Sequence, residues 1–406
     1  MKLRVGAALF GLGVLLLVFA AGLPFYVAPA VTKLPYDLEP TTSIAEAKNA
    51  RFLKITASGS SVSIEVPQAT LLSNVEVIPQ PDDTKDRLPK ELTGDAVIWD
   101  VYQTVRRADN EDVVSQYSTE LALYRISGAA APWKDQWLNE TGAGETPVGN
   151  VSYSGQIYKF PFGTGKRDYQ VFDRDLKRAL PAKFTGTENI KGVEAYRFEQ
   201  RIENEALTTP ESSLQTLIGK FAPGATSGQI VYSNTRTLWV DPVTGSYLNV
   251  REQQRKELRP NTGTPTVLLD ADFNYTDETV SNSVKTAKDN RFKIGLISLW
   301  GPIAAGVLGL IALVAGAWLV TRANGASARH RADAAAAASA AAPAADPAQT
   351  RVDQEPVRDT ETVEQSRTEP AGGPLTDEIP PASTNWKSED PTVPTQRPAS
   401  GEVEQR

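Results

Sequence analysis

The hydrophobic positions of this chain are concentrated in two uncharged segments, residues 5–32 and 294–321, one near each end. Each is long enough to cross a bilayer as a helix, which takes about 20 mainly apolar residues. The segment between them, residues 33–293, mixes polar, charged and apolar positions. We therefore predict two transmembrane helices, with residues 33–293 on one side of a membrane and residues 1–4 and 322–406 on the other.

Between the two apolar segments, apolar residues most often recur at every second position. Val62, Ile64 and Val66 alternate with small or charged residues, and Val97, Trp99 and Val101 alternate with Ile98, Asp100 and Tyr102. Alternation of this kind is typical of strands. Strands are predicted at residues 61–66, 97–102, 121–126, 156–160, 193–202, 229–232, 237–240, 247–253 and 267–275.

The clearest predicted hairpin covers residues 237–250. Asp241 and Pro242 open a turn there, and Gly245 can supply the positive φ that closes it. Two strands joined by so short a loop must be antiparallel.

Helical spacing of apolar residues is rarer. Leu214, Leu217 and Ile218 predict a helix over residues 210–221, and residues 171–180 are a second candidate. The predicted fold class is therefore α+β, a predominantly antiparallel β domain flanked by two transmembrane α-helices, with a disordered C-terminal tail. The strands show no regular repeat, so neither a propeller nor a solenoid is predicted.

The basic residues beside the first apolar segment predict its orientation. Lys2 and Arg4 precede it, whereas only Lys33 closely follows it, and cytoplasmic flanks carry the excess of Lys and Arg. We expect a plasma-membrane protein with both termini cytoplasmic and residues 33–293 extracytoplasmic. The alternative is a cleaved signal peptide with a site near Ala28, which would also export the central region.

The tail, residues 322–406, is rich in Ala, Pro, Glu, Thr and Ser. Such a composition buries too little apolar surface to fold, so we predict a disordered tether, with a docking or phosphorylation segment as the alternative. The chain has a net charge of −7 and no basic stripe with interleaved aromatic residues. Nucleic acid is therefore not an expected partner.

The chain has no cysteine, and its one histidine, His330, lies beyond the second apolar segment. This excludes Ser-His-Asp, Cys-His and His-metal chemistry from residues 33–293. The remaining enzymatic option is carboxylate chemistry, for which two pairs spaced i, i+2 are candidates. The pairs are Asp173 with Asp175 and Asp270 with Asp272. Such pairs also arise by chance on helix N-termini and solvated strands, so we predict no enzyme, no cofactor and no metal.

Several predicted strands carry large apolar side chains on both faces, so each face needs a covering layer. One candidate cover is a bound lipid or acyl chain, and the favoured alternative is a second sheet or a helix layer. The residues of this candidate apolar ligand surface are Ile98, Trp99, Tyr102, Tyr196 and Phe198.

The second apolar segment also carries a stripe of small residues, spaced four, three and four: Ala305, Gly309, Ala312 and Gly316. Such a stripe lets another helix approach closely. The candidate partners are the first apolar segment, through Ala7, Gly11 and Gly13, a neighbouring copy, or another membrane protein. The oligomeric state is not predicted.

Two segments, residues 32–38 (TKLPYDL) and 186–198 (GTENIKGVEAYRF), resemble an actinobacterial family of two-span envelope proteins. Its members have no established function and are sometimes labelled PorA-like porins. The resemblance covers residues 1 to about 325. It implies a role in the maturation of lipomannan to lipoarabinomannan, and it brings no catalytic motif to any residue of this chain. Two terminal spans around a β domain are also similar, by analogy only, to animal scavenger receptors with a lipid tunnel.

A literal porin is disfavoured because transmembrane barrels have no long apolar helices. The functional hypothesis is an accessory membrane protein that binds a lipid or lipid-linked glycan and presents it to membrane-bound glycosyltransferases. The alternatives are a carboxylate-dependent glycan enzyme and a purely structural interaction module.

Overall fold

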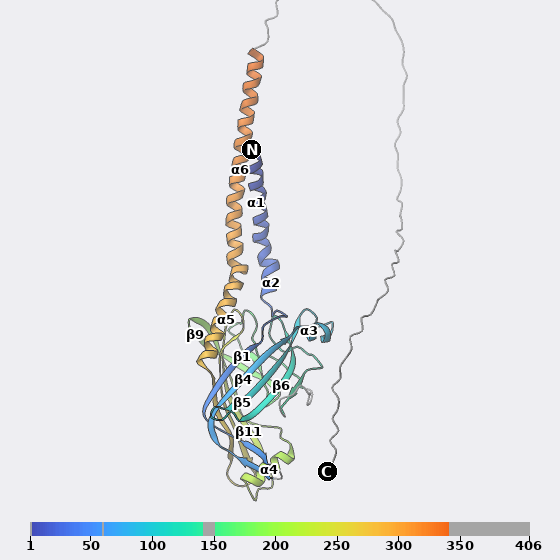
Figure 1. Ribbon diagram of the computed structural model, residues 1–406, viewed down its shortest axis with the longest axis vertical. Coiled ribbons are helices and arrows are strands. Elements are labelled where there is room, and N and C mark those ends of the chain that lie inside the picture. Colours follow the sequence, from blue (N-terminus) through green and yellow to red (C-terminus); the bar gives the residue numbers. More distant parts are fainter. Residues whose placement is uncertain (1, 59–60, 141–150, 341–406) are drawn as a thin grey trace, which may run out of the picture. The chain divides into compact units, whose positions relative to one another are not determined.

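The computed structural model describes residues 2–58, 61–140 and 151–340 (Figure 1). These residues belong to one compact unit, Met1–Ala340. Most of the predicted disordered tail, residues 341–406, lies outside the described residues.

The strands carry most of the domain between the two apolar segments. They are β1 (Thr41–Phe52), β2 (Lys54–Ser58), β3 (Ser61–Glu65), β4 (Gln68–Gln80), β5 (Ala96–Arg107), β6 (Val113–Tyr124), β7 (Trp137–Asn139), β8 (Tyr169–Asp173), β9 (Arg178–Ile190), β10 (Val193–Ala206), β11 (Gly228–Val240), β12 (Tyr247–Pro260) and β13 (Thr266–Tyr275). The helices are α1 (Lys2–Gly22), α2 (Ala28–Val31), α3 (Pro81–Arg87), α4 (Glu211–Phe221), α5 (Asp277–Gly295) and α6 (Gly301–Ala340), with π-helical turns η1 (Leu23–Val27) and η2 (Leu296–Trp300).

Eleven strands form one sheet in the order β7-β6-β5-β4-β1-β13-β12-β11-β10-β9-β8, and β2 pairs with β3 in a separate hairpin. Every neighbouring pair in the large sheet is antiparallel. The predicted fold class, an antiparallel β domain flanked by two long apolar helices, is confirmed.

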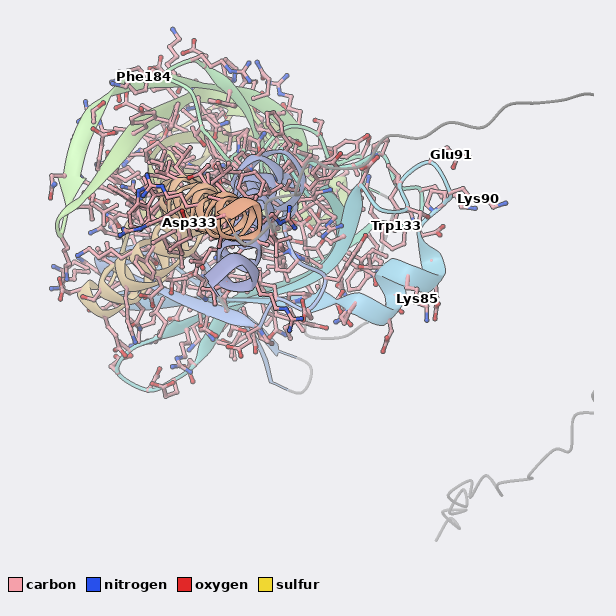
Figure 2. All side chains as sticks on the ribbon, turned by 90° about the horizontal axis from the view of Figure 1, so that it is seen from above. Lys85, Lys90, Glu91, Trp133, Phe184 and Asp333 are labelled. Atoms are coloured by element: carbon pink, nitrogen blue, oxygen red, sulfur yellow. The ribbon has the colours of Figure 1, made fainter. Side chains whose placement is uncertain are left out.

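The large sheet curls until its two ends approach each other. Arg236 on β11 and Asp173 on β8 form an ion pair at 3.4 Å. In a flat sheet these strands would be about 14 Å apart, because neighbouring strands are spaced by about 4.8 Å. At the closure, Lys177 beyond β8 pairs with Glu140 beyond β7 at 3.0 Å. The sheet therefore has an inner, concave face and an outer face, and Figure 2 shows the strands following this curved path.

Single bridges continue the closure between β6 and β8. Leu123 pairs with Ala130, Ala129 with Gln156, and Gln156 with Val171. The segment around Gln156, predicted as a strand over 156–160, is thus a loop that makes only single bridges, and that strand prediction is wrong. Phe160 instead donates its backbone N–H to Gly245 in the β11–β12 turn.

The predicted helix over residues 171–180 is also wrong. Residues 171–173 belong to β8 and residues 178–180 to β9, joined by a tight turn. Asp173 accepts the backbone N–H of Leu176, and Lys177 takes a φ of 53°, which reverses the chain. The apolar residues at helical spacing are therefore cross-strand partners, with Val171 opposite Leu180.

The predicted hairpin over residues 237–250 is confirmed by the antiparallel pairing of β11 and β12. Asp241 accepts the N–H of Val243 and the hydroxyl of Thr244, while Gly245 has a φ of 73°. A Cβ at Gly245 would overlap the carbonyl oxygen of Phe160, so both the conformation and the close approach require glycine here.

Helices pack against both faces of the sheet, α4 on the inner face and α5 on the outer face. Leu214, Leu217 and Ile218 of α4 pack with Leu258 and Leu268, which confirms the predicted helix over residues 210–221. Leu258 lies opposite Ile230, which shares a face of β11 with Arg236, so this contact is on the inner face. On α5, Val280, Val284 and Ala287 pack with residues of β10 and β12. Thr276 caps α5 by accepting the N–H of Thr279.

Two helical segments are long and apolar enough to cross a membrane, Arg4–Val31 and Asp277–Arg322. Within them α1 and α6 lie side by side (Figure 1). The helix continues beyond the predicted end of the second span at 321 and is described as far as Ala340. Residues 322–340, predicted as part of the disordered tail, are therefore helical, in keeping with the high helix propensity of their alanines.

Candidate functional site

The five residues of the candidate apolar ligand surface do not share one face. Trp99, Tyr196 and Phe198 lie on the inner face of the sheet, whereas Ile98 and Tyr102 lie on the outer face, because neighbours along a strand point to opposite sides. The neighbours of each side chain determine whether a ligand could contact it.

On the inner face, Phe198 is fully buried in an aromatic cluster. Its ring centroid lies 4.8 Å from that of Phe160 and 5.6 Å from that of Tyr169. Tyr196 packs at the margin of this cluster, 5.7 Å from Phe184. Trp99 is 5 % exposed and belongs to a second inner cluster with Val101, Leu121 and other residues. Protein side chains thus already cover Trp99 and Phe198.

On the outer face, Ile98 is fully buried beneath Leu88, Leu92 and Trp133. Beside it the Arg87 guanidinium makes a bidentate pair with Glu120, at 2.7 and 2.8 Å. Figure 2 shows Trp133 on this side of the domain, with Lys85, Lys90 and Glu91 on the neighbouring turn and helix. The chain's own residues therefore cover Ile98, whereas Tyr102 on the same face is half-buried.

The inner apolar clusters adjoin a set of polar side chains that we call the inner polar band. On β5, the apolar Val101 is followed two residues later, on the same face, by Gln103. On β11, the apolar Leu238 is preceded two residues earlier, on the same face, by Arg236. The inner polar band comprises Gln103, Tyr117, Tyr158, Asp173, Arg174, Asp175, Gln200, Tyr232, Asn234, Arg236, Glu252, Gln254, Lys256 and Tyr275.

Arg236 is at the centre of the inner polar band. Its Nε donates to Glu252 at 2.7 Å, and its Nη1 donates to Gln200 and to the backbone carbonyl of Phe172, each at 3.1 Å. Its Nη2 contacts Asp173 at 3.4 Å, and Asp173 also accepts the hydroxyl of Tyr232 at 3.2 Å. A buried guanidinium is stable only with such partners.

Two further basic groups complete the inner polar band. Lys256 donates to Asp175 at 2.5 Å. Arg174 donates to Gln103 at 2.9 Å and lies 4.1 Å above the ring centroid of Tyr117. The Tyr117 hydroxyl lies 3.3 Å from that of Tyr158.

Burial and pairing set the ionisation of the inner polar band. Burial opposes ionisation of Glu252, but the Arg236 guanidinium outweighs it and lowers the pKa of Glu252. Burial likewise opposes ionisation of Asp175, whose pKa is nevertheless lowered by Lys256 and Arg174. Burial dominates at Asp173 and raises its pKa, partly offset by Arg236. Glu252 and Asp175 are therefore held as carboxylates at neutral pH.

The two candidate carboxylate pairs lie in different surroundings. Asp173 and Asp175 belong to the inner polar band, where basic side chains hold them. Asp270 and Asp272 lie on the outer face and pair with Arg255 and Arg251, at 2.8 and 2.6 Å. Within residues 2–58, 61–140 and 151–340, no cluster of three or more His, Cys, Asp or Glu could hold a metal ion.

Part of the predicted small-residue stripe lies against α1. A Cβ on Gly309 would come within 3.0 Å of the carbonyl oxygen of Gly13, and one on Gly316 would overlap the backbone of Phe10. Ala305 and Ala312 are half-buried on the same side. The α1 contacts come from Gly13 and, unforeseen from the sequence, Gly6, whereas Gly11 faces open space and Ala7 is exposed.

Two hollows stand out in the described part of the chain, and neither lies on the inner face. One, of about 400 Å³, lies between the end of α4 and the β12–β13 turn, lined by Phe221, Gly224 and Gly263 among others. The other, of about 550 Å³, lies on α6 against Ile311, Val314 and Trp318.

Sequence reasoning missed the inner polar band. Its members come from seven strands and two loops, and on β12 they stand in a run, residues 251–257, that is polar on both faces. In sequence alone, such a polar stretch looks the same as a solvent-exposed strand. A strand that is polar on both faces in the middle of a buried sheet is the signal that could have found it.

A family model described as Porin PorA matches residues 5–318, which include both apolar segments and the whole β domain. This chain belongs to the PorA family. The resemblance carried by residues 32–38 and 186–198 is thereby confirmed, and the PorA-family chain is a membrane protein with two transmembrane helices.

Two curated relatives bear the same description, Porin PorA. The protein of Corynebacterium resistens is 29 % identical over 223 residues, which is 50 % of this chain and 53 % of the relative. The protein of Corynebacterium amycolatum is 22 % identical over 303 residues, which is 62 % of this chain and 77 % of the relative. The match to the first relative thus spans only about half of that relative's length.

Proposed function

We propose that this PorA-family protein binds a lipid or lipid-linked glycan through its β domain, on the extracytoplasmic side, and presents it to membrane-bound glycosyltransferases. In this role it is a non-enzymatic accessory factor of lipoglycan maturation, the process that the family resemblance implies. The observation that carries the proposal is the inner face, where the inner polar band keeps contact with solvent and adjoins aromatic clusters whose marginal rings, such as Tyr196, are only half-buried. A ligand with an apolar and a polar part matches such a surface.

The carboxylate-dependent enzyme is the weaker proposal. Asp173, Asp175, Asp270 and Asp272 all have basic partners, and carboxylates fixed in ion pairs are poor acids and bases at neutral pH. We therefore expect Asp270→Asn together with Asp272→Asn to leave lipoglycan maturation unchanged.

The name of the two relatives suggests a channel as a second candidate function. The outer face of the sheet carries exposed ion pairs, such as Arg251 with Asp272, where a barrel in lipid needs an apolar band. The two membrane helices have no charged residue between 5 and 32 or between 294 and 321. We therefore propose that the protein forms no open pore.

The test is lipid analysis of the full chain purified in mild detergent. We expect mass spectrometry to show one lipid or glycolipid class enriched over bulk membrane lipid. The control is an unrelated two-span protein purified in the same way, and an identical lipid profile for the two would overturn the proposal. Stepwise conductance of the purified chain in planar bilayers would instead favour the channel.

A further inference from the structure

The inner polar band is electrically balanced. Its three basic groups are Arg174, Arg236 and Lys256, and its three acidic groups are Asp173, Asp175 and Glu252. Each acidic group is paired with a basic one, so no excess charge is left for a phosphate, a sulfate or a metal ion.

The same side chains keep contact with solvent although the curled sheet surrounds them. The side chains of Arg236, Glu252 and Lys256 are 14 %, 21 % and 23 % exposed. Tyr158 and Tyr275 are half-buried, and burial raises the pKa of both hydroxyls, which keeps them neutral. The inner polar band is thus reachable from solvent and offers neutral hydroxyls beside fixed ion pairs.

Some hydrogen-bonding capacity of the inner polar band is unused. Asn234 is 1 % exposed, and its Oδ1 has no hydrogen-bond partner among the described residues. Arg174 Nε makes no hydrogen bond within the described chain, and its partner there is the Glu140 carboxylate, 3.6 Å away. Unpaired buried polar atoms are costly and are therefore uncommon in native proteins unless a ligand or water completes them.

We propose that the inner polar band is a binding site for a neutral saccharide. Each sugar hydroxyl both donates and accepts, which suits carboxylates, guanidinium groups, amides and tyrosine hydroxyls whose charges already cancel. Tyrosine rings offer flat apolar surface for the C–H faces of a sugar ring. The inference rests on the proposed function, because it identifies the glycan part of the ligand as the part that this band holds, beside the aromatic clusters.

The test compares two neighbouring glutamines of β12. Gln254 points inward and donates to Glu252 at 2.6 Å, whereas Gln253 is exposed on the outer face. The full chain in nanodiscs is titrated with neutral tetrasaccharides, mannotetraose and maltotetraose, by calorimetry or ligand-observed NMR. We expect binding that Gln254→Ala weakens about tenfold, as the loss of one or two hydrogen bonds gives, and that Gln253→Ala leaves unchanged.

A second variant, Tyr158→Phe, removes one hydroxyl of the inner polar band. It replaces Gln254→Ala in the same titration if that variant does not fold. Equal weakening by the Gln253 and Gln254 variants, or no saccharide binding at all, would overturn the inference. Inorganic phosphate and dihexanoyl phosphatidylcholine are titrated alongside, and tighter binding of either would point to an anionic or zwitterionic headgroup and also overturn it.

The outcome is separable from that of the proposed function. If the purified chain carries an enriched lipid but binds no saccharide, the further inference fails and the proposed function stands. If saccharide binds through Gln254 and no lipid class is enriched, the lipid part of the proposed function fails alone.

Discussion

At the scale of single residues, buried charge decides what the β domain tolerates. Lys159 is 5 % exposed, and its Nζ donates to the backbone carbonyls of Phe160 and Thr244. Arg236 is surrounded by Glu252, Asp173 and Gln200. Both cations hold together segments that are distant in sequence, so both should matter for stability.

The ionisation of Lys159 should make stability depend on pH. Burial lowers its pKa to about 7, with Asp241 opposing the shift, whereas an unfolded lysine has a pKa of about 10.4. Between these two pKa values the unfolded state binds more protons than the folded state. Lys159 therefore makes the free energy of unfolding rise with pH from about 7 to 10, and the destabilisation that its burial causes is fully present below pH 7. We expect denaturation midpoints of Lys159→Met to rise less over this range than those of the unaltered protein.

The control for Lys159 is Lys183→Met, since Lys183 is exposed on β9. It should keep the slope of the unaltered protein. Parallel slopes for all three proteins, measured by tryptophan fluorescence in one detergent, would contradict the predicted ionisation.

Arg236→Met should be strongly destabilising. The change leaves Glu252 and Asp173 buried without their cation, for which the expected cost is about 3–5 kcal/mol. Arg251→Met breaks an exposed pair with Asp272 on the outer face and should cost less than about 1 kcal/mol. Denaturant unfolding of both variants measures the difference, and equal midpoints would show that the inner ion pairs contribute no more than surface ones.

At the scale of elements, two arrangements organise the chain. The first is the curled sheet, which creates an inner face. The second is the pair of helices α1 and α6, which pack against each other through glycines. The buried positions of α1 include Gly6 and Gly13, and those of α6 include Gly309 and Gly316, each pair seven residues apart. A seven-residue repeat of contacts is typical of helices that wrap round each other with a left-handed supercoil.

Gly316→Leu should separate α1 from α6. Even a Cβ at this position overlaps the backbone of Phe10, so the helices must move apart and lose the contacts that hold them. We expect a lower thermal midpoint in detergent. Gly11→Leu is the matched control, because an added Cβ there has nothing within 4 Å. The same loss in both variants would indicate that helix packing does not depend on this close approach.

At the scale of the whole molecule, the two membrane spans predict that the β domain lies on the outer side of the plasma membrane and the C-terminal tail on the cytoplasmic side. Protease added to intact spheroplasts should digest the part between residues 33 and 293 and leave a protected fragment that contains the C-terminal tail. An epitope at the C-terminus should become accessible only after the membrane is opened. Digestion of that epitope in intact cells, with protection of the central domain, would reverse the proposed orientation.

Much of the fold was predictable because it depends on local patterns. The apolar lengths gave both spans, alternation gave most strands, and Asp241, Pro242 and Gly245 gave the β11–β12 hairpin. The helix predicted at 171–180 failed because apolar spacing alone does not distinguish a helix from two short strands joined by a turn. The turn between the two strands depends on the left-handed backbone conformation of Lys177, and a lysine in the sequence does not indicate that conformation.

The candidate site was less accessible to sequence reasoning. Trp99 and Phe198 were predicted as candidate apolar ligand residues, but only the fold shows that they face inward and that their neighbours already cover them. Arg236 and Asp173 are far apart in sequence, and their pairing depends on how tightly eleven strands curl.

The sequence by itself determined the two membrane spans, the antiparallel β character of the domain between them and the absence of Cys and His chemistry there, since length, alternation and residue type are local properties. Only the tertiary structure decided which face of each strand is inner, which acids meet which bases, and which glycines bring α1 and α6 together. These depend on contacts between distant segments, and a curled sheet converts polar positions that look solvent-exposed along the chain into one enclosed, charge-balanced surface.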